Sequence, residues 1–220
     1  MVGLLSMEGT LVAGTLEEKQ HIAQRQFSYV PGAEWAVLEQ PFWKHHVVFK
    51  LVKSTDPRFS HRPKVAVDEQ NKPHLLTDGI LKISHESVLK EFNRAAQSEA
   101  VQITADNVEE YVRFFWNVHL GYSDALRLIG KDTVDRVLKL PPHSDEAQRL
   151  QEAGLERQGQ PHVAIASING GFHATVFAWN SQGGWVVQHD FTIHPDGTVA
   201  LEGTKFRQPP EAASTGPHTR

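Results

Sequence analysis

The sequence predicts an α+β fold in which a curved antiparallel sheet packs on helices. Predicted helices and strands are clustered along the chain and do not strictly alternate, which is typical of this class. Three consecutive strands joined by hairpin turns are expected over 171–206, and the segment 106–119 is apolar enough to form the most buried helix. A helix held in a curved sheet, a cystatin-like arrangement, is therefore the closest architecture.

Capping signals predict where the helices begin. Thr15 and Glu18 have the spacing of a capping box, in which each side chain hydrogen-bonds the backbone N–H of the other residue. We expect the second helix to open at Ser84 and the third to be capped by Asp106. A further helix is expected at 144–156, within a polar region of the chain.

Short apolar or alternating runs predict the strands that precede the final meander. They are expected at 43–53, 64–67, 74–83, 125–129 and 162–168. The chain has 220 residues, of which 40% are hydrophobic and 22% charged, values that suit one globular domain over 1–206. Residues 1–60 are a possible separate N-terminal layer. The tail at 207–220 has three prolines and no large apolar residue, so we expect it to be disordered.

Composition also bounds the location and the chemistry. The chain has no cysteine, which excludes disulfides, thiolate metal sites and cysteine nucleophiles and fits a reducing compartment. No apolar run approaches the roughly 20 residues that span a bilayer, and the N-terminus lacks the pattern of a signal peptide. We expect a cytoplasmic protein that does not contact membranes.

The stretch "HPDGT" at 194–198 predicts the register of the last hairpin. A three-residue loop at 195–197 places Phe191 opposite Leu201. Continuing the same count places His189 opposite Gly203, and Asp190 opposite Glu202.

The preceding hairpin is expected to place Trp179 opposite Trp185 and Thr175 opposite His189. Because side chains alternate along a strand, one face of the ribbon is then apolar and the other polar. The predicted apolar face holds Phe177, Trp179, Trp185, Val187, Phe191, Ile193, Val199 and Leu201. This meander is mainly a scaffold for the core.

His189 is the polar exception on that apolar face and is the candidate general base. The alternative is a buried histidine hydrogen-bonded to Thr175, and His173 lies at a diagonal on the same face. On the other face, Asp190 and Glu202 could share a proton or bind a cation. The alternative is that both carboxylates are simply solvated.

A basic segment at 44–64 carries a local charge of +5 and interleaves aromatic residues. It is a candidate site for a phosphate, an acidic partner or nucleic acid, although nucleic acid is the less expected ligand. The alternative is an ordinary solvated loop. The candidate ligand-binding residues are Arg58, His61, Arg62 and Lys64, together with Thr175 and His173 of the meander.

No metal and no cofactor are expected. The chain has 13 histidines but no H-x-x-x-H or H-x-H spacing, and His45 and His46 are adjacent in a predicted strand, so they point to opposite faces. No Gly-rich phosphate loop, nucleophile elbow or dinucleotide fingerprint is present.

The segments "VEEYVRFFWNVHLG", "LRLI" and "DFTIHPDGTVALE" resemble a module in bacterial proteins of uncharacterised function, over roughly 64–206. The resemblance implies an α+β fold and no known activity. The favoured function is a non-enzymatic binding or accessory protein with a protein or small-molecule partner. The alternatives are a small hydrolase or lyase that uses His189 as base, and an anion or nucleic-acid binder that uses the basic segment; whether the chain is an enzyme stays open.

Overall fold

The computed structural model describes residues 14–27, 32–55, 62–77, 85–120, 126–128, 163–180 and 185–207. In chain order its elements are α1 (Leu16–Arg25), β1 (Glu34–Val37), β2 (Val47–Lys53), β3 (Lys64–Val67), β4 (Pro73–Thr77), α2 (His85–Ser98), α3 (Val108–Phe115), a π-helical turn η2 (Trp116–Leu120), β5 (Leu126–Leu128), β6 (Val163–Ile168), β7 (Gly171–Asn180), β8 (Trp185–Ile193) and β9 (Val199–Arg207). The predicted α+β class is confirmed. Among the described helices, none combines the length and the apolar character needed to cross a bilayer.

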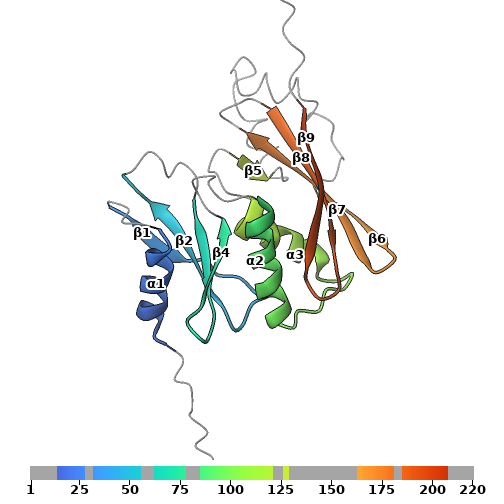
Figure 1. Cartoon of the computed structure of the whole chain (residues 1–220). Helices are drawn as coiled ribbons and strands as arrows, with labels where there is room; N and C mark the ends of the chain where they lie inside the picture. Colours follow the sequence, from blue (N-terminus) through green and yellow to red (C-terminus); the bar gives the residue numbers. More distant parts are fainter. Residues whose placement is uncertain are drawn as a thin grey trace, which may run out of the picture.

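The strands form two antiparallel sheets (Figure 1). The first has the order β1-β2-β3-β4, and the second has the order β5-β7-β8-β9 with β6 also paired to β7. Helices α2 and α3 lie between the two sheets, and α1 lies on the outer face of the first (Figure 1). A cystatin-like arrangement is not confirmed, because the strands divide between two sheets.

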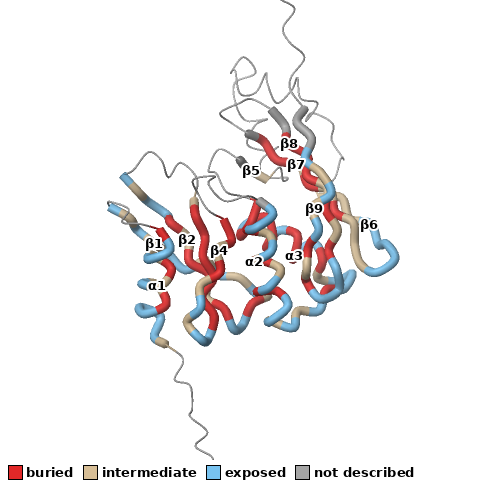
Figure 2. The backbone as a smooth tube through the Cα atoms, in the orientation of Figure 1, coloured by how far each residue is buried: buried red, intermediate tan, exposed pale blue. Residues whose placement is uncertain are grey.

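One large apolar core joins the helices to both sheets (Figure 2). Phe92 of α2 and Phe115 of α3 are completely buried, and they meet with ring centroids 4.9 Å apart. Leu76 of the first sheet and Phe191 of the second belong to the same cluster. A second, smaller cluster lies under α1 on the other face of the first sheet. The predicted apolar helix is therefore the centre of the molecule.

Helix α1 begins as predicted. The Thr15 hydroxyl accepts a hydrogen bond from the Glu18 N–H at 3.2 Å, and Glu18 accepts one from the Thr15 N–H at 2.7 Å. The helix is also anchored to the first sheet, because the buried Lys19 donates from Nζ to the backbone oxygen of Asp68 at 2.8 Å. This bond holds the start of the β3–β4 turn against α1.

The N-termini of α2 and α3 were both predicted from capping residues, but the structure describes only that of α3 in full. Ser84 lies outside the described residues, and α2 is described from His85. The predicted cap at Asp106 is wrong, because Asn107 is the N-cap of α3. Asn107 Oδ1 instead accepts a hydrogen bond from the N–H of Thr104 at 2.9 Å, which closes the turn before the helix. The expected helix at 144–156 also lies outside the described residues.

The first sheet differs from the predicted strands at one end. Strand β2 begins at Val47, so 43–46 is not strand, and the four-residue β1 was not predicted. The reason is tertiary: the N–H groups of Lys44 and His45 donate to the Glu99 carboxylate instead of to a neighbouring strand. A side chain 53 to 55 positions away thus bends the chain just before β2.

The predicted register between β7 and β8 is wrong by one residue. The structure pairs Val176 with His189 and Asn180 with Trp185. The buried residues of β7 therefore include Ala174, Val176 and Ala178, whereas Phe177 is only half-buried. Small side chains on this face leave room for Phe191, which pairs with Ala174 and packs against the helices.

The β8–β9 hairpin is as predicted near its turn and differs beyond it. Phe191 pairs with Leu201, and the His194 N–H donates to the Thr198 oxygen at 2.8 Å, so the loop at 195–197 is confirmed. An irregularity between Asp190 and Phe191 leaves Glu202 without a partner in the ladder. The structure pairs Asp190 with Gly203, and His189 with Thr204. The predicted pairs of His189 with Gly203 and Asp190 with Glu202 are therefore wrong.

The predicted apolar stripe is confirmed in β8 and β9 only, because Phe177 and Trp179 pair with Gln188 and Val186 and so lie on the other face of β7. Val187, Phe191, Ile193 and Val199 are buried, and Leu201 packs against the same core while partly exposed. The side chain of Trp185 lies outside the described part of the chain. The predicted tail is described only at Arg207, the last residue of β9.

Candidate functional site

The predicted catalytic residues of the meander do not form one site. His189 is buried in the second sheet, where Nδ1 lies 3.1 Å from Thr204 Oγ1 and the ring packs edge-on against Trp116. Its expected partner Thr175 instead donates to Asp190 Oδ1 at 2.7 Å. His189 and Asp190 are adjacent in a strand and therefore face opposite sides.

Glu202 is parted from Asp190 by the bulge. It accepts a hydrogen bond from Thr192 Oγ1 and lies 3.2 Å from Nε2 of His173. Asp190 also accepts from Gln188 Nε2 at 2.9 Å, so each carboxylate has its own set of neighbours. The structure does not bring the two carboxylates together as a proton-sharing pair.

The basic segment is only partly described. Arg58 and His61 lie outside the described residues, and Arg62 is half-buried just before β3. Lys64 is 1% exposed within β3, so it does not belong to a surface patch. Lys53 forms an ion pair with Glu34 at 2.7 Å. The described part of this segment therefore does not converge on one ligand.

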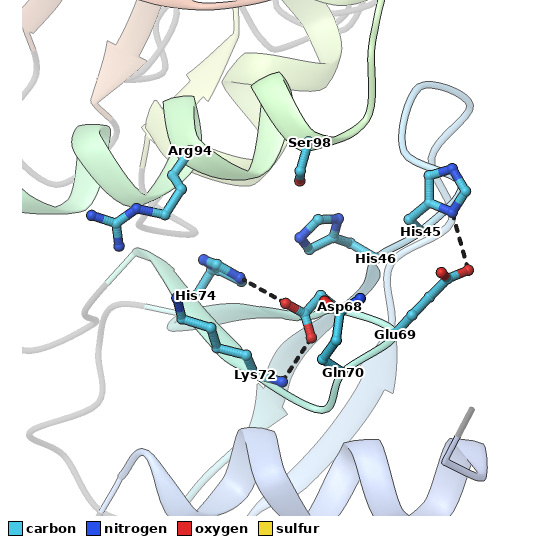
Figure 3. A pocket seen from close by; sticks show the side chains of 9 residues that line it. All are labelled: His45, His46, Asp68, Glu69, Gln70, Lys72, His74, Arg94 and Ser98. Carbon is cyan, nitrogen blue, oxygen red and sulfur yellow. Dashed lines mark hydrogen bonds and ion pairs between the residues drawn. The ribbon is translucent and has the colours of Figure 1, made fainter. Parts of the chain in front are cut away.

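A different group of side chains surrounds a pocket of about 420 Å³ between α2 and the β3–β4 turn (Figure 3). The lining residues are His45, His46, Asp68, Glu69, Gln70, Lys72, His74, Arg94 and Ser98. They come from three parts of the chain: the bend before β2, the β3–β4 hairpin and the C-terminal half of α2. All of them are polar or charged.

His46 is fixed in this pocket by a buried carboxylate. Its Nδ1 lies 2.7 Å from Glu99 Oε1, and the two side chains are 1% and 0% exposed. Glu99 is itself held by the N–H groups of Lys44 and His45, at 2.6 Å and 2.8 Å. This network orients the imidazole so that Nε2 is the nitrogen left for another partner.

His74 is fixed in the same way on β4. Its Nδ1 lies 3.1 Å from Glu91 Oε2, and its Nε2 lies 3.4 Å from Asp68 Oδ2. Asp68 is positioned at the end of β3 because its Oδ1 accepts from the Lys72 N–H at 2.7 Å and its backbone oxygen accepts from Lys19. Figure 3 shows the rings of His46 and His74 on either side of the Asp68 carboxylate.

The three side chains offer one ligand atom each, and these atoms all lie within 4.8 Å of one another. Among the described residues, Nε2 of His46 has no hydrogen-bond partner although it is buried. A buried polar atom without a partner is unfavourable by about 1–3 kcal/mol, so it calls for an explanation. We call His46, Asp68 and His74 the His-Asp-His cluster.

The electrostatic state of the cluster suits a cation. Burial lowers the pKa of His46 and outweighs the opposing effect of Glu99, so the ring is neutral near neutral pH. Burial raises the pKa of Asp68, but the hydrogen bonds from the Lys72 N–H and from His74 outweigh it, and the pKa lies below its usual value. Neutral imidazole and ionised carboxylate are the forms that bind metal ions.

Sequence reasoning missed this cluster because its members are 22 and 6 positions apart and form no short ligand motif. The expectation that His45 and His46 face opposite sides of a strand does not apply, because both precede β2 and both line the pocket; His46 is buried, whereas His45 is exposed and pairs with Glu69 at 3.0 Å. The signal that could have found the cluster is the hairpin, since Asp68 and His74 flank a turn between two short strands.

Comparison with known proteins adds no assignment. No protein-family model matches the chain, and no match was found among curated proteins or among solved structures. The fold and the pocket define the class at hand: an α+β protein with two antiparallel sheets and a His-Asp-His cluster beside its central helices.

Proposed function

We propose that the protein is a binding protein whose ligand is a divalent transition-metal ion, held by the His-Asp-His cluster. The observation that carries the proposal is the buried Nε2 of His46, which has no hydrogen-bond partner in the described part of the chain and belongs to a cluster with Asp68 and His74. A metal ion would occupy the place of the missing partner.

The outer contacts of the two histidines support the proposal. A metal-bound histidine usually donates its other ring N–H to a carboxylate or a carbonyl, which fixes the tautomer and raises the basicity of the ligand nitrogen. Here both histidines meet a carboxylate at Nδ1, Glu99 for His46 and Glu91 for His74. Nε2 of His46 has no partner, and Nε2 of His74 would exchange its 3.4 Å contact with Asp68 Oδ2 for the same ion.

The spacing of the ligand atoms supports a transition metal. Ligand distances of about 2.0–2.2 Å place tetrahedral ligands about 3.3–3.6 Å apart. The His74 to Asp68 distance of 3.4 Å already lies in this range, and the 4.8 Å limit for the whole cluster means that no pair has to contract by more than about 1.5 Å on binding. Two imidazoles and one carboxylate suit zinc, iron or cobalt better than magnesium or calcium, which prefer oxygen ligands.

The composition limits the ligand types that are available for this function. A chain without cysteine binds no metal through thiolates, so nitrogen and oxygen ligands are the available choice. The favoured class from the sequence, a binding or accessory protein, remains our proposal, with the metal ion as the first partner.

The test is metal binding by the full chain. Apo protein is titrated with Zn²⁺ and Co²⁺ by calorimetry, and elemental analysis after dialysis measures the stoichiometry. We expect a single ion per chain, and we expect His46→Ala and Asp68→Asn to lose at least about 100-fold in affinity because each removes one of three ligands.

His173→Ala is the matched control, because it removes a histidine that pairs with Glu202 on the second sheet, outside the cluster. This variant should bind metal as the wild type does. Circular dichroism spectra verify that each variant is folded, and Asp68→Asn provides a near-isosteric change if His46→Ala does not fold. Wild-type affinity in the folded Asp68→Asn and His46→Ala variants, or no bound ion in the wild type, would contradict the proposal.

A further inference from the structure

We infer that the bound ion presents open coordination positions to the pocket and that a small ligand with an oxyanion group, a phosphate or a carboxylate, fills them. This inference rests on the proposed function, since the metal supplies the first contact. Three protein ligands leave a position open on a four-coordinate ion and more on a six-coordinate ion. All three ligands line the pocket of about 420 Å³, so the open positions face it.

The lining of the pocket selects a hydrophilic ligand. Pockets for apolar ligands are lined mostly by hydrophobic and aromatic side chains. This pocket is lined only by polar and charged residues, with Gln70 and Ser98 beside the ionisable groups. Water or a polar ligand can satisfy these groups, whereas an apolar ligand would leave them without partners.

Arg94 is the second anchor for an oxyanion. It lies on α2, opposite the β3–β4 hairpin (Figure 3), and its Nη1 donates to Glu91 Oε1 at 2.5 Å. A guanidinium carries five N–H donors, so it can hold Glu91 and a further acceptor at once. Lys72 adds a second positive charge to the pocket lining.

The acidic residues near the pocket do not cancel this attraction at the ligand's position. Asp68 is itself a metal ligand in the proposal, and Glu69 Oε1 is held 3.0 Å from His45 Nδ1. Glu91 and Glu99 contact the histidines at Nδ1, on the far side of each ring from Nε2, and they do not line the pocket. An oxyanion between the metal and Arg94 would therefore meet the ion on one side, and on the other the guanidinium N–H donors that Glu91 leaves open while it compensates part of their charge.

The test uses the full chain loaded with Co²⁺, whose visible absorption bands report the coordination of the ion. Inorganic phosphate and acetate are titrated separately into the loaded and the metal-free protein, with affinities from calorimetry. We expect saturable binding and altered Co²⁺ bands only in the loaded protein, and the tighter of the two anions identifies the oxyanion class. Arg94→Gln should weaken that binding by about tenfold, because it removes charge-assisted hydrogen bonds.

Arg113→Gln is the matched control, since Arg113 is also an exposed helical arginine paired with a glutamate, at 2.9 Å from Glu109, but does not line the pocket. It should bind the anion as the wild type does. Absence of anion binding to the loaded protein, equal affinity in the metal-free protein, or wild-type affinity in Arg94→Gln would each overturn the inference. The Co²⁺ bands are recorded before any anion is added, so a failure to bind metal overturns the proposed function as well and is told apart from a failure to bind anion.

Discussion

Nδ1 of His46 lies 2.7 Å from Oε1 of Glu99, and both side chains are almost completely buried. The two residues are 53 positions apart, one on the bend before β2 and the other directly after α2. The same carboxylate accepts hydrogen bonds from the N–H groups of Lys44 and His45. One acidic side chain therefore shapes the bend before β2 and orients the His46 imidazole. The contact therefore connects the fold of the first sheet to the proposed metal site.

This relationship predicts the effect of Glu99→Gln. The amide keeps the size of the side chain but removes the negative charge that supports the His46 N–H and raises the basicity of Nε2. We expect metal affinity to fall by about 10- to 100-fold, as is usual when a partner of a metal-bound histidine is changed. A chelator competition assay with Zn²⁺ measures this change.

Glu86→Gln is the control for this prediction, because Glu86 is an exposed acidic residue of α2 that pairs with Lys90 at 2.9 Å. Its metal affinity should equal that of the wild type. An equally small effect of Glu99→Gln would show that Glu99 serves only to hold the bend.

Gly197 is predicted to tolerate no side chain. Its φ of +79° lies in the left-handed region, and an added Cβ would lie 2.9 Å from Tyr111 Oη, which donates to the Gly197 oxygen at 2.5 Å. We expect Gly197→Ala to lower the free energy of unfolding by about 1–3 kcal/mol, measured by urea denaturation.

Gly203→Ala provides the comparison for Gly197→Ala, because a Cβ at Gly203 meets no atom within 4 Å and its backbone is outside the left-handed region. Its effect should stay within about 0.5 kcal/mol. Equal losses in the two variants would contradict the argument from backbone conformation and close approach.

Asp196 predicts a pH dependence of stability. Burial raises its pKa, but hydrogen bonds from the Thr198 hydroxyl and N–H and the charge of His194 outweigh this, so the pKa lies below its usual value. A carboxyl whose pKa is lower in the folded state stabilises the fold above its unfolded pKa of about 3.9, and this contribution is lost as the pH falls through the folded pKa.

Asp196→Asn should therefore be less stable than the wild type at neutral pH, and the difference should shrink as the pH falls below about 4. Denaturation curves of both proteins from about pH 7 to about pH 2 measure it. A difference that stays constant over this range would show that the ionised carboxylate contributes nothing.

Much of the fold was predictable because its determinants are local. The capping box at Thr15 and Glu18 depends on residues three positions apart, and the loop at 195–197 depends on a proline, an aspartate and a glycine in succession. The helix that begins at Val108 was expected to be the most buried because its own sequence is apolar on more than one face. These features need no distant partner to form.

The register errors have a common cause in contacts that a strand does not carry in its own sequence. Alternation along 171–180 allowed Phe177 to face the core, but the space under the helices is taken by Phe191, so the small Ala174 and Val176 lie inside. The extra residue Glu202 in β9 likewise forms a bulge that no turn residue nearby predicts.

The sequence by itself determined the fold class, the apolar central helix and the loop of the last hairpin, because each follows from propensities and periodicities within a few residues. Only the tertiary structure decided that the strands form two sheets and that His46, Asp68 and His74 meet beside α2. Those outcomes depend on packing and on buried carboxylates tens of positions away. Such contacts stabilise the structure only when distant segments of the chain come together.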